Sequence, residues 1–127
     1  MKIKVIVSVG ELLDKISILR VKLKNIKNSK KLEEVEKELN ALTSCAIEHS
    51  VYSEEFIDRL EIVNNELWDI EDHIRSLDKN NLVETIEFIN TARSVYITND
   101  KRFDIKNEIN EHYGSFIKEQ KDYESYT

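Results

Sequence analysis

The hydrophobic positions between Ser53 and Leu77 recur at the spacing of an α-helix. The apolar side chains follow one another at alternating steps of four and three residues, namely Phe56, Leu60, Val63, Leu67, Ile70, Ile74 and Leu77. This spacing places all of them on one face of a helix. The pattern therefore predicts a helix over about residues 53–77, against whose apolar face the rest of the chain packs.

The same spacing predicts three further helices, over about residues 8–27, 30–50 and 82–113, followed by a polar tail over residues 115–127. Ser8 and Glu11 form a capping box at the start of the first, in which each side chain bonds to the backbone amide of the other residue. Gly114 stands where a helix end favours glycine. The apolar face of the last stretch stops near Thr98–Asp100, so this stretch is either one continuous helix or two shorter ones.

Residues 2–7, Lys-Ile-Lys-Val-Ile-Val, predict a short strand with Ile3, Val5 and Val7 on one face. A lone strand cannot satisfy its own backbone hydrogen bonds. It therefore pairs with another segment, pairs with a second copy of the chain, or is only an extended lead-in to the first helix. Together with the length of the last helix, the strand favours a symmetric homodimer.

Length and composition fit a single all-α domain over residues 1–127. The chain has no Pro, only two Gly and no stretch with the composition of a linker. Long helices tolerate Pro poorly, whereas all-β folds use Pro and Gly in their many turns. We therefore expect an antiparallel bundle of four or five helices.

Charge and cysteine content argue against several classes of function. The net charge is −6, and residues 41–80 contain three basic and ten acidic residues, which disfavours binding to nucleic acid. No apolar run approaches the roughly 18 residues that a membrane span requires. A single cysteine, Cys45, fits a reducing compartment, so we expect a cytoplasmic protein. The three histidines stand far apart, and we expect neither a metal nor a cofactor.

Two polar stripes interrupt the predicted apolar helix faces. They comprise Asn64, Trp68, Glu71 and Arg75 within residues 53–77, and Asn99, Arg102, Lys106 and Asn110 within residues 82–113. Burying such groups unpaired is costly. Either they pair across the helix interface as a structural network, with Glu71 or Asp100 as the acidic partner of Arg102, or they line a crevice. In the second case, guanidinium groups beside an indole suit a carboxylate or phosphate on a planar body.

Two catalytic templates match the chain weakly. Glu33-x-x-Glu36 and Glu66-x-x-Asp69 have the spacing by which helical nucleotide pyrophosphohydrolases hold Mg²⁺, but such spacings are common by chance on charged helices. The size of the chain and its Arg, Lys and Glu residues are similar to those of small helical chorismate mutases, without a shared motif. Neither template identifies a reaction.

Several longer motifs resemble those of one family. They are Val9-Gly10-Glu11-Leu12-Leu13-Asp14-Lys15-Ile16, Asn64-x-x-Leu67-Trp68-x-Ile70-Glu71-Asp72-x-Ile74-Arg75, Ala92-Arg93-Ser94-Val95-Tyr96-x-Thr98-Asn99-Asp100-x-Arg102, Lys106-x-x-Ile109-Asn110 and the stretch from Gly114-Ser115 to Tyr123. Over nearly the whole chain they resemble a family of small bacterial and phage proteins, a domain of unknown function. The resemblance implies no activity, but its motifs include both polar stripes and so strengthen the ligand hypothesis.

Two functions therefore stand open. The first is a non-catalytic interaction or accessory module, whose polar stripes lock the bundle or contact a protein partner. The second is a protein or enzyme that binds a small phosphorylated or carboxylated metabolite in a pocket between the third and fourth helices.

Overall fold

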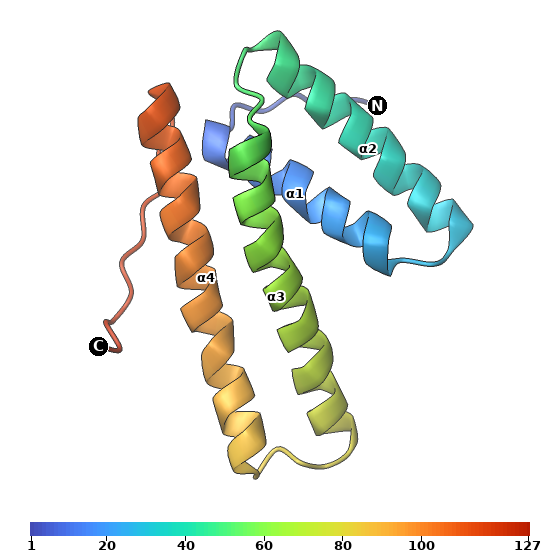
Figure 1. Cartoon of the computed structure of the whole chain (residues 1–127), viewed down its shortest axis with the longest axis vertical. Coiled ribbons are helices and arrows are strands. Elements are labelled where there is room, and N and C mark those ends of the chain that lie inside the picture. Colours follow the sequence, from blue (N-terminus) through green and yellow to red (C-terminus); the bar gives the residue numbers. More distant parts are fainter.

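The computed structural model describes residues 1–127 and contains four α-helices and no strand. They are α1 (Val9–Asn25), α2 (Ser29–Glu48), α3 (Glu54–Lys79) and α4 (Ile86–Tyr113). The helices α3 and α4 run antiparallel as a long pair, and the shorter pair α1 and α2 crosses one half of it (Figure 1). The predicted all-α class is confirmed.

Each helix begins at a side chain that accepts a hydrogen bond from a backbone amide of the first turn. The first amide groups of a helix have no partner within the helix, so such a cap fixes where the helix starts. The four caps are Ser8 to the amide of Glu11, Asn28 to Lys31, Ser53 to Phe56 and Thr85 to Phe88. The last helix ends at Gly114, whose φ of +59° is the left-handed conformation that favours glycine.

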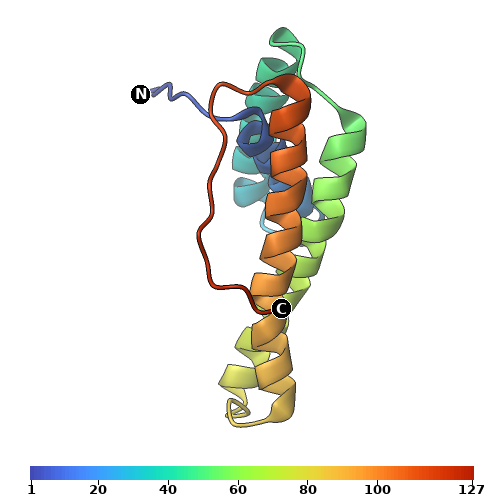
Figure 2. The ribbon, with the colours of Figure 1, turned by 90° about the vertical axis from the view of Figure 1, so that its left-hand side faces the viewer.

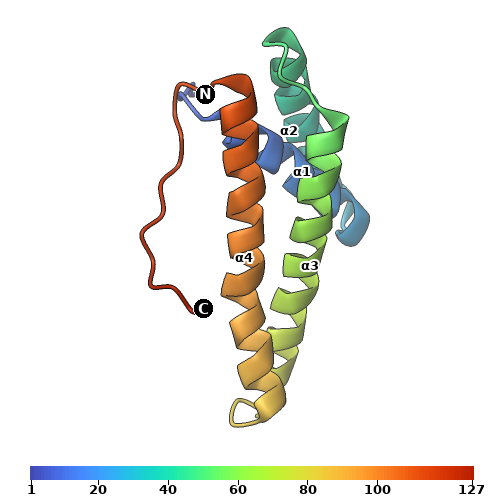
Figure 3. The same cartoon turned by 60° about the vertical axis from the view of Figure 1, so that its left-hand side comes forward.

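The helix α1 is the central element, because it packs against all three other helices. The helix α2 packs only against α1, whereas α3 packs against both α1 and α4. The expectation that residues 53–77 organise the whole chain is therefore only partly right. The main core consists of Leu12, Leu13, Ile16, Ala46, Ile57, Leu60 and Ile109. It lies where α1 and α2 cover the long pair; beyond it, α3 and α4 continue as a two-helix hairpin (Figures 1 and 3).

The predicted strand does not form within this chain. Residues 1–7 are exposed, and none of their backbone groups bonds to the backbone of another segment. Figure 2 shows this segment projecting away from the helices. No other extended segment of the chain pairs with it. Two of the three alternatives therefore stay open: pairing with a second copy, or a simple lead-in to the first helix.

The last helix is continuous through Thr98–Asp100. Its polar side chains contact α1 and the C-terminal tail. The apolar face therefore stops because these segments become the neighbours of α4, and not because the helix breaks. The helix begins four residues later than predicted, and Ile86 and Ile89 near its start are exposed. The tail returns alongside α4 without regular structure (Figure 2). None of the four helices combines the length and the apolar character needed to cross a membrane.

Gly10 allows α1 and α4 to approach closely. A Cβ atom added at Gly10 would lie 2.6 Å from the backbone oxygen of Lys106 and 2.9 Å from Oδ1 of Asn110. Because the nearer atom belongs to the backbone of a helix, the two helices would have to move apart to accept a side chain.

We therefore predict that Gly10→Ala lowers the free energy of unfolding by about 1–3 kcal/mol. Elsewhere in a helix the same change raises stability, by up to about 1 kcal/mol. Urea denaturation measures the unfolding free energy of Gly10→Ala. Ser44→Ala, a change to alanine at an exposed position of α2, is the control. A stabilised Gly10→Ala protein would contradict the close contact.

Candidate functional site

A carboxylate with no exposed surface lies where three helices meet. Asp14 of α1 is 0% exposed. Arg102 of α4 donates from Nε to both carboxylate oxygens at 3.0 Å and from Nη2 to Oδ2. Asn64 of α3 donates from Nδ2 to Oδ1 at 2.9 Å. A guanidinium that bonds a carboxylate through two nitrogens fixes direction as well as charge, so the Arg102 contact orients α4 against α1. The bond from Asn64 links α3 to the same carboxylate.

Ser17 completes this cluster one helical turn further along α1. Its hydroxyl donates to the backbone oxygen of Asp14 at 2.7 Å and accepts from Nδ2 of Asn64 at 2.8 Å. The side-chain amide of Asn64 therefore donates both hydrogens to α1. We call Asp14, Ser17, Asn64 and Arg102 the Asp14 network. The bonds to Asp14 raise the pKa of Arg102 above its usual value, although burial opposes the increase.

Lys106 forms a second buried ionic contact, one turn along α4. Its side chain is 7% exposed, and Nζ donates to Glu11 at 2.8 Å and pairs with Glu119 of the tail at 2.6 Å. Burial acts to lower the pKa of Lys106, but the hydrogen bonds to the two carboxylates outweigh it and the pKa lies above its usual value. The predicted capping box is therefore only half formed: Ser8 bonds to the amide of Glu11, while the Glu11 carboxylate pairs with Lys106.

The first turn of α1 is held against the end of α4 by Asn110. Its Oδ1 accepts a hydrogen bond from the backbone of Gly10 at 2.7 Å, and the side chain is buried. Its Nδ2 has no partner. One residue earlier, the amide of Val9 donates to Oγ of Ser115 at 3.1 Å. Asn110 is therefore a helix-packing residue.

Two open clefts flank Arg102. The first, the Trp68 cleft, has a volume of about 530 Å³ and lies between α1, α3 and α4. The second, the tail cleft, has a volume of about 570 Å³ and lies between α4 and the C-terminal tail. Arg102 and Asn99 line both.

The structure brings six of the eight residues proposed from the sequence together and places the other two elsewhere. Six line the Trp68 cleft: Asn64, Trp68, Glu71, Arg75, Asn99 and Arg102. Lys106 lines the tail cleft instead, and Asn110 packs against Gly10 away from both. The expected acidic partners of Arg102 were wrong: Glu71 lies 3.5 Å from Arg75, and Asp100 pairs with Lys121 of the tail.

Sequence reasoning missed the acidic residues that complete these contacts. From the sequence, Glu11 is assigned to the capping box with Ser8, and Asp14 and Glu119 are included only as members of the family motifs. A signal was present for Asp14, because small and polar residues recur along the first helix at steps of four, three and four, at Gly10, Asp14, Ser17 and Val21. That spacing marks a helix face that accepts close neighbours and polar partners.

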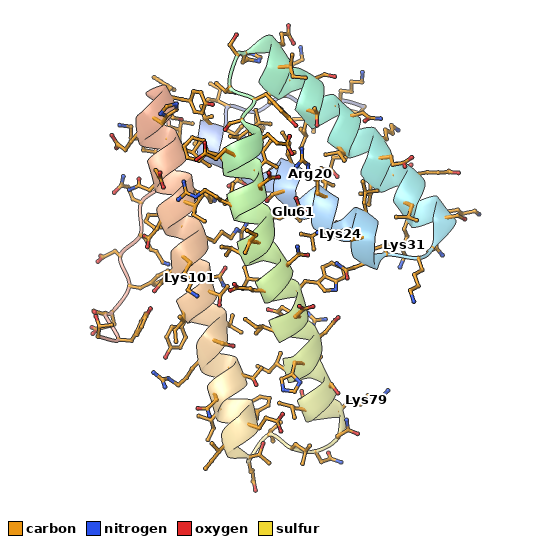
Figure 4. All side chains as sticks on the ribbon, viewed as in Figure 1. Arg20, Lys24, Lys31, Glu61, Lys79 and Lys101 are labelled. Carbon is orange, nitrogen blue, oxygen red and sulfur yellow. The ribbon has the colours of Figure 1, made fainter.

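A separate ionic cluster ties α1 to α3 at the surface. Arg20 bonds to Glu54 at 2.7 Å and to Tyr52 at 2.9 Å, and Lys24 lies 2.8 Å from Glu61. Figure 4 shows Arg20 and Lys24 on α1 beside Glu61 on α3. Hydrogen bonds from Arg20 and Tyr52 lower the pKa of Glu54 to about 2. This cluster orients the two helices and lies outside both clefts.

The acidic pairs that resemble a Mg²⁺ motif do not converge. Glu33 and Glu36 are exposed on α2, a helix that closely approaches only α1. No group of three or more His, Cys, Asp or Glu side chains is placed to hold a metal ion.

The chain was compared with known families, proteins and structures. Over residues 2–127 it matches a family model described as "Family of unknown function (DUF6165)". This match confirms the resemblance to a domain of unknown function over nearly the whole chain. The search of curated proteins and the search of solved structures gave no match.

The depressed pKa of Glu54 predicts a dependence of stability on pH. Because the pKa falls from 4.5 to about 2 on folding, the ionised group stabilises the fold above about pH 4.5 and loses this effect as the pH falls towards 2. Glu54 is half exposed, so Glu54→Gln should cost less than about 1 kcal/mol at pH 7. Urea denaturation between pH 7 and 2 should show that the difference in unfolding free energy between the parent and Glu54→Gln shrinks as the pH falls. A difference that grows at low pH would refute the stabilising role of the Glu54 carboxylate. Glu55→Gln, in the same helical turn, is the control.

Proposed function

The chain belongs to this family of unknown function, and we propose that it is a non-catalytic interaction module whose helices are locked by the Asp14 network. The observation that carries this proposal is that the polar groups best suited to chemistry already have partners inside the chain. Arg102 commits Nε and Nη2 to Asp14, and Lys106 lies between Glu11 and Glu119. A ligand would have to replace these bonds to use the same nitrogen atoms, and of the Arg102 guanidinium only Nη1 is left uncommitted to Asp14.

A buried ion pair of this kind is better suited to fixing the arrangement of the helices than to binding a ligand. Forming it contributes little net stability, because both charges lose their hydration. Removing one partner is costly, since the other charge stays buried, so alternative helix arrangements that separate the pair are disfavoured. The network thereby keeps the outer surfaces in one geometry, and a preorganised surface loses less conformational entropy when it binds a protein partner. We also propose a cytoplasmic location, because a chain whose single cysteine, Cys45, is free suits a reducing compartment.

Arg102→Ala tests this proposal directly. Because Asp14 would stay buried without its cation, the free energy of unfolding should fall by roughly 3–5 kcal/mol. Arg75→Ala is the matched control, since Arg75 is a 79% exposed arginine on the same cleft and its loss should change stability by less than about 0.5 kcal/mol. Both are measured by urea denaturation at pH 7. An Arg102→Ala protein as stable as the parent, or more stable, would contradict the structural role.

A second candidate function is the binding of a small carboxylated or phosphorylated metabolite in the Trp68 cleft. The observation in its favour is that six of the eight residues proposed from sequence line this one space. Nη1 of Arg102 is not used by Asp14, and Arg75 stands at the same cleft. The carboxylates of Glu71 and Asp72 also line the cleft, so its charge is mixed and a highly charged anion is disfavoured.

The fluorescence of the only tryptophan tests this second function. If the cleft binds such a metabolite, adding phosphorylated and carboxylated compounds one at a time should change the emission of Trp68 saturably with one of them. Arg75→Gln should weaken that response while leaving the fold intact, because Arg75 is largely exposed. A parent protein whose emission and melting temperature respond to none of these compounds would exclude the candidate.

A further inference from the structure

The N-terminal segment exposes a concentration of apolar surface that no helix covers. Ile3, Val5 and Ile6 are 78%, 74% and 74% exposed, and Val7 is also exposed. The backbone of residues 1–7 makes no hydrogen bond to another backbone segment. Free backbone groups in a stretch rich in β-branched residues form a template for pairing with another strand.

We propose that this segment is a self-association surface, in which residues 3–7 of two copies pair as antiparallel strands about a two-fold axis at Val5. Such an interface uses the same surface on both copies, so the segment must complement itself. Residues 1–7 line neither cleft and do not belong to the Asp14 network, so the proposal does not depend on what either cleft binds.

The order of side chains selects this register. When Val5 lies opposite Val5 of the second copy, Ile3 lies opposite Val7, and one face of the ribbon carries six apolar side chains. On the other face Lys4 lies opposite Ile6, so no two lysines oppose each other. Shifting the pairing by one residue would put lysines on both faces. Parallel pairing in register would set Lys2 beside Lys2 and Lys4 beside Lys4, which repel.

The start of the tail supplies a cover for the apolar face. The hydrogen bond from Val9 to Ser115 places this part of the tail beside the end of the segment (Figure 2). There Phe116 is 91% exposed and Ile117 is also exposed. A two-stranded ribbon by itself is marginal in water and needs such a packing partner. The whole interface would bury roughly 1,000 Å² or less, a size typical of weak, reversible association.

Cysteine cross-linking tests the register. In a Cys45→Ser background, Val5→Cys should form a disulfide-linked dimer under mild oxidation, because cysteines that face each other across an antiparallel pair have Cα atoms within bonding range. Ile3→Cys alone should not, since its two copies would lie roughly 14 Å apart along the ribbon. A mixture of Ile3→Cys and Val7→Cys proteins should cross-link. Self-linking of Ile3→Cys as efficient as that of Val5→Cys would overturn the register.

Sedimentation equilibrium tests the association itself. Between about 1 and 200 μM the parent should shift from its monomer mass of 15.0 kDa towards twice that value. Val5→Asp should stay monomeric, because it places two carboxylates at the axis. Its helical circular dichroism should be unchanged, since residue 5 lies outside the helices. A parent that is monomeric throughout, or a dimer that Val5→Asp does not weaken, would refute the proposal.

Discussion

The buried carboxylate of Asp14 is the constraint on which the arrangement of the helices depends. A charge without exposed surface is tolerated only if it is paired and hydrogen-bonded, and its partners come from α3 and α4. The helix α1 therefore has to lie where Asn64 and Arg102 can both reach it. Gly10 permits the close approach that this position demands, and the apolar core fills the space on the other side of α1.

The same logic extends along α4 to the C-terminal tail. Lys106 links Glu11 of α1 to Glu119 of the tail, and Lys121 pairs with Asp100 and lies over the ring of Phe103. Near its end, the ring of Tyr126 packs edge-on against that of Tyr96. The tail is therefore held by polar and aromatic contacts with little apolar burial, and most of those contacts depend on charges that α4 presents.

The sequence predicted the helices well because their signals are local. The Ser8 cap and the glycine at position 114 act within one turn of the residues that they affect. The cap at Thr85 was missed, and the last helix was therefore predicted to begin four residues too early. Pairing is different, because periodicity reports which face is buried and not what covers it. The spacing of Arg102 therefore predicted a buried polar residue with Glu71 or Asp100 as its partner. The side chain is instead 28% exposed, and its partner, Asp14, is 88 positions away in the sequence. The segment 2–7 has the pattern of a strand, but no other segment of the chain is available to pair with it, so no strand forms.

Asp14 and Arg102 act as a unit. A double-mutant cycle at pH 7 with Asp14→Ala, Arg102→Ala and the combined variant measures the free energy of their coupling by urea denaturation. If the pair holds the helices together, the combined variant should be more stable than the sum of the two single losses predicts, by about 1–3 kcal/mol. Losses that add to within about 0.5 kcal/mol would show that the two residues act independently, and would contradict the account.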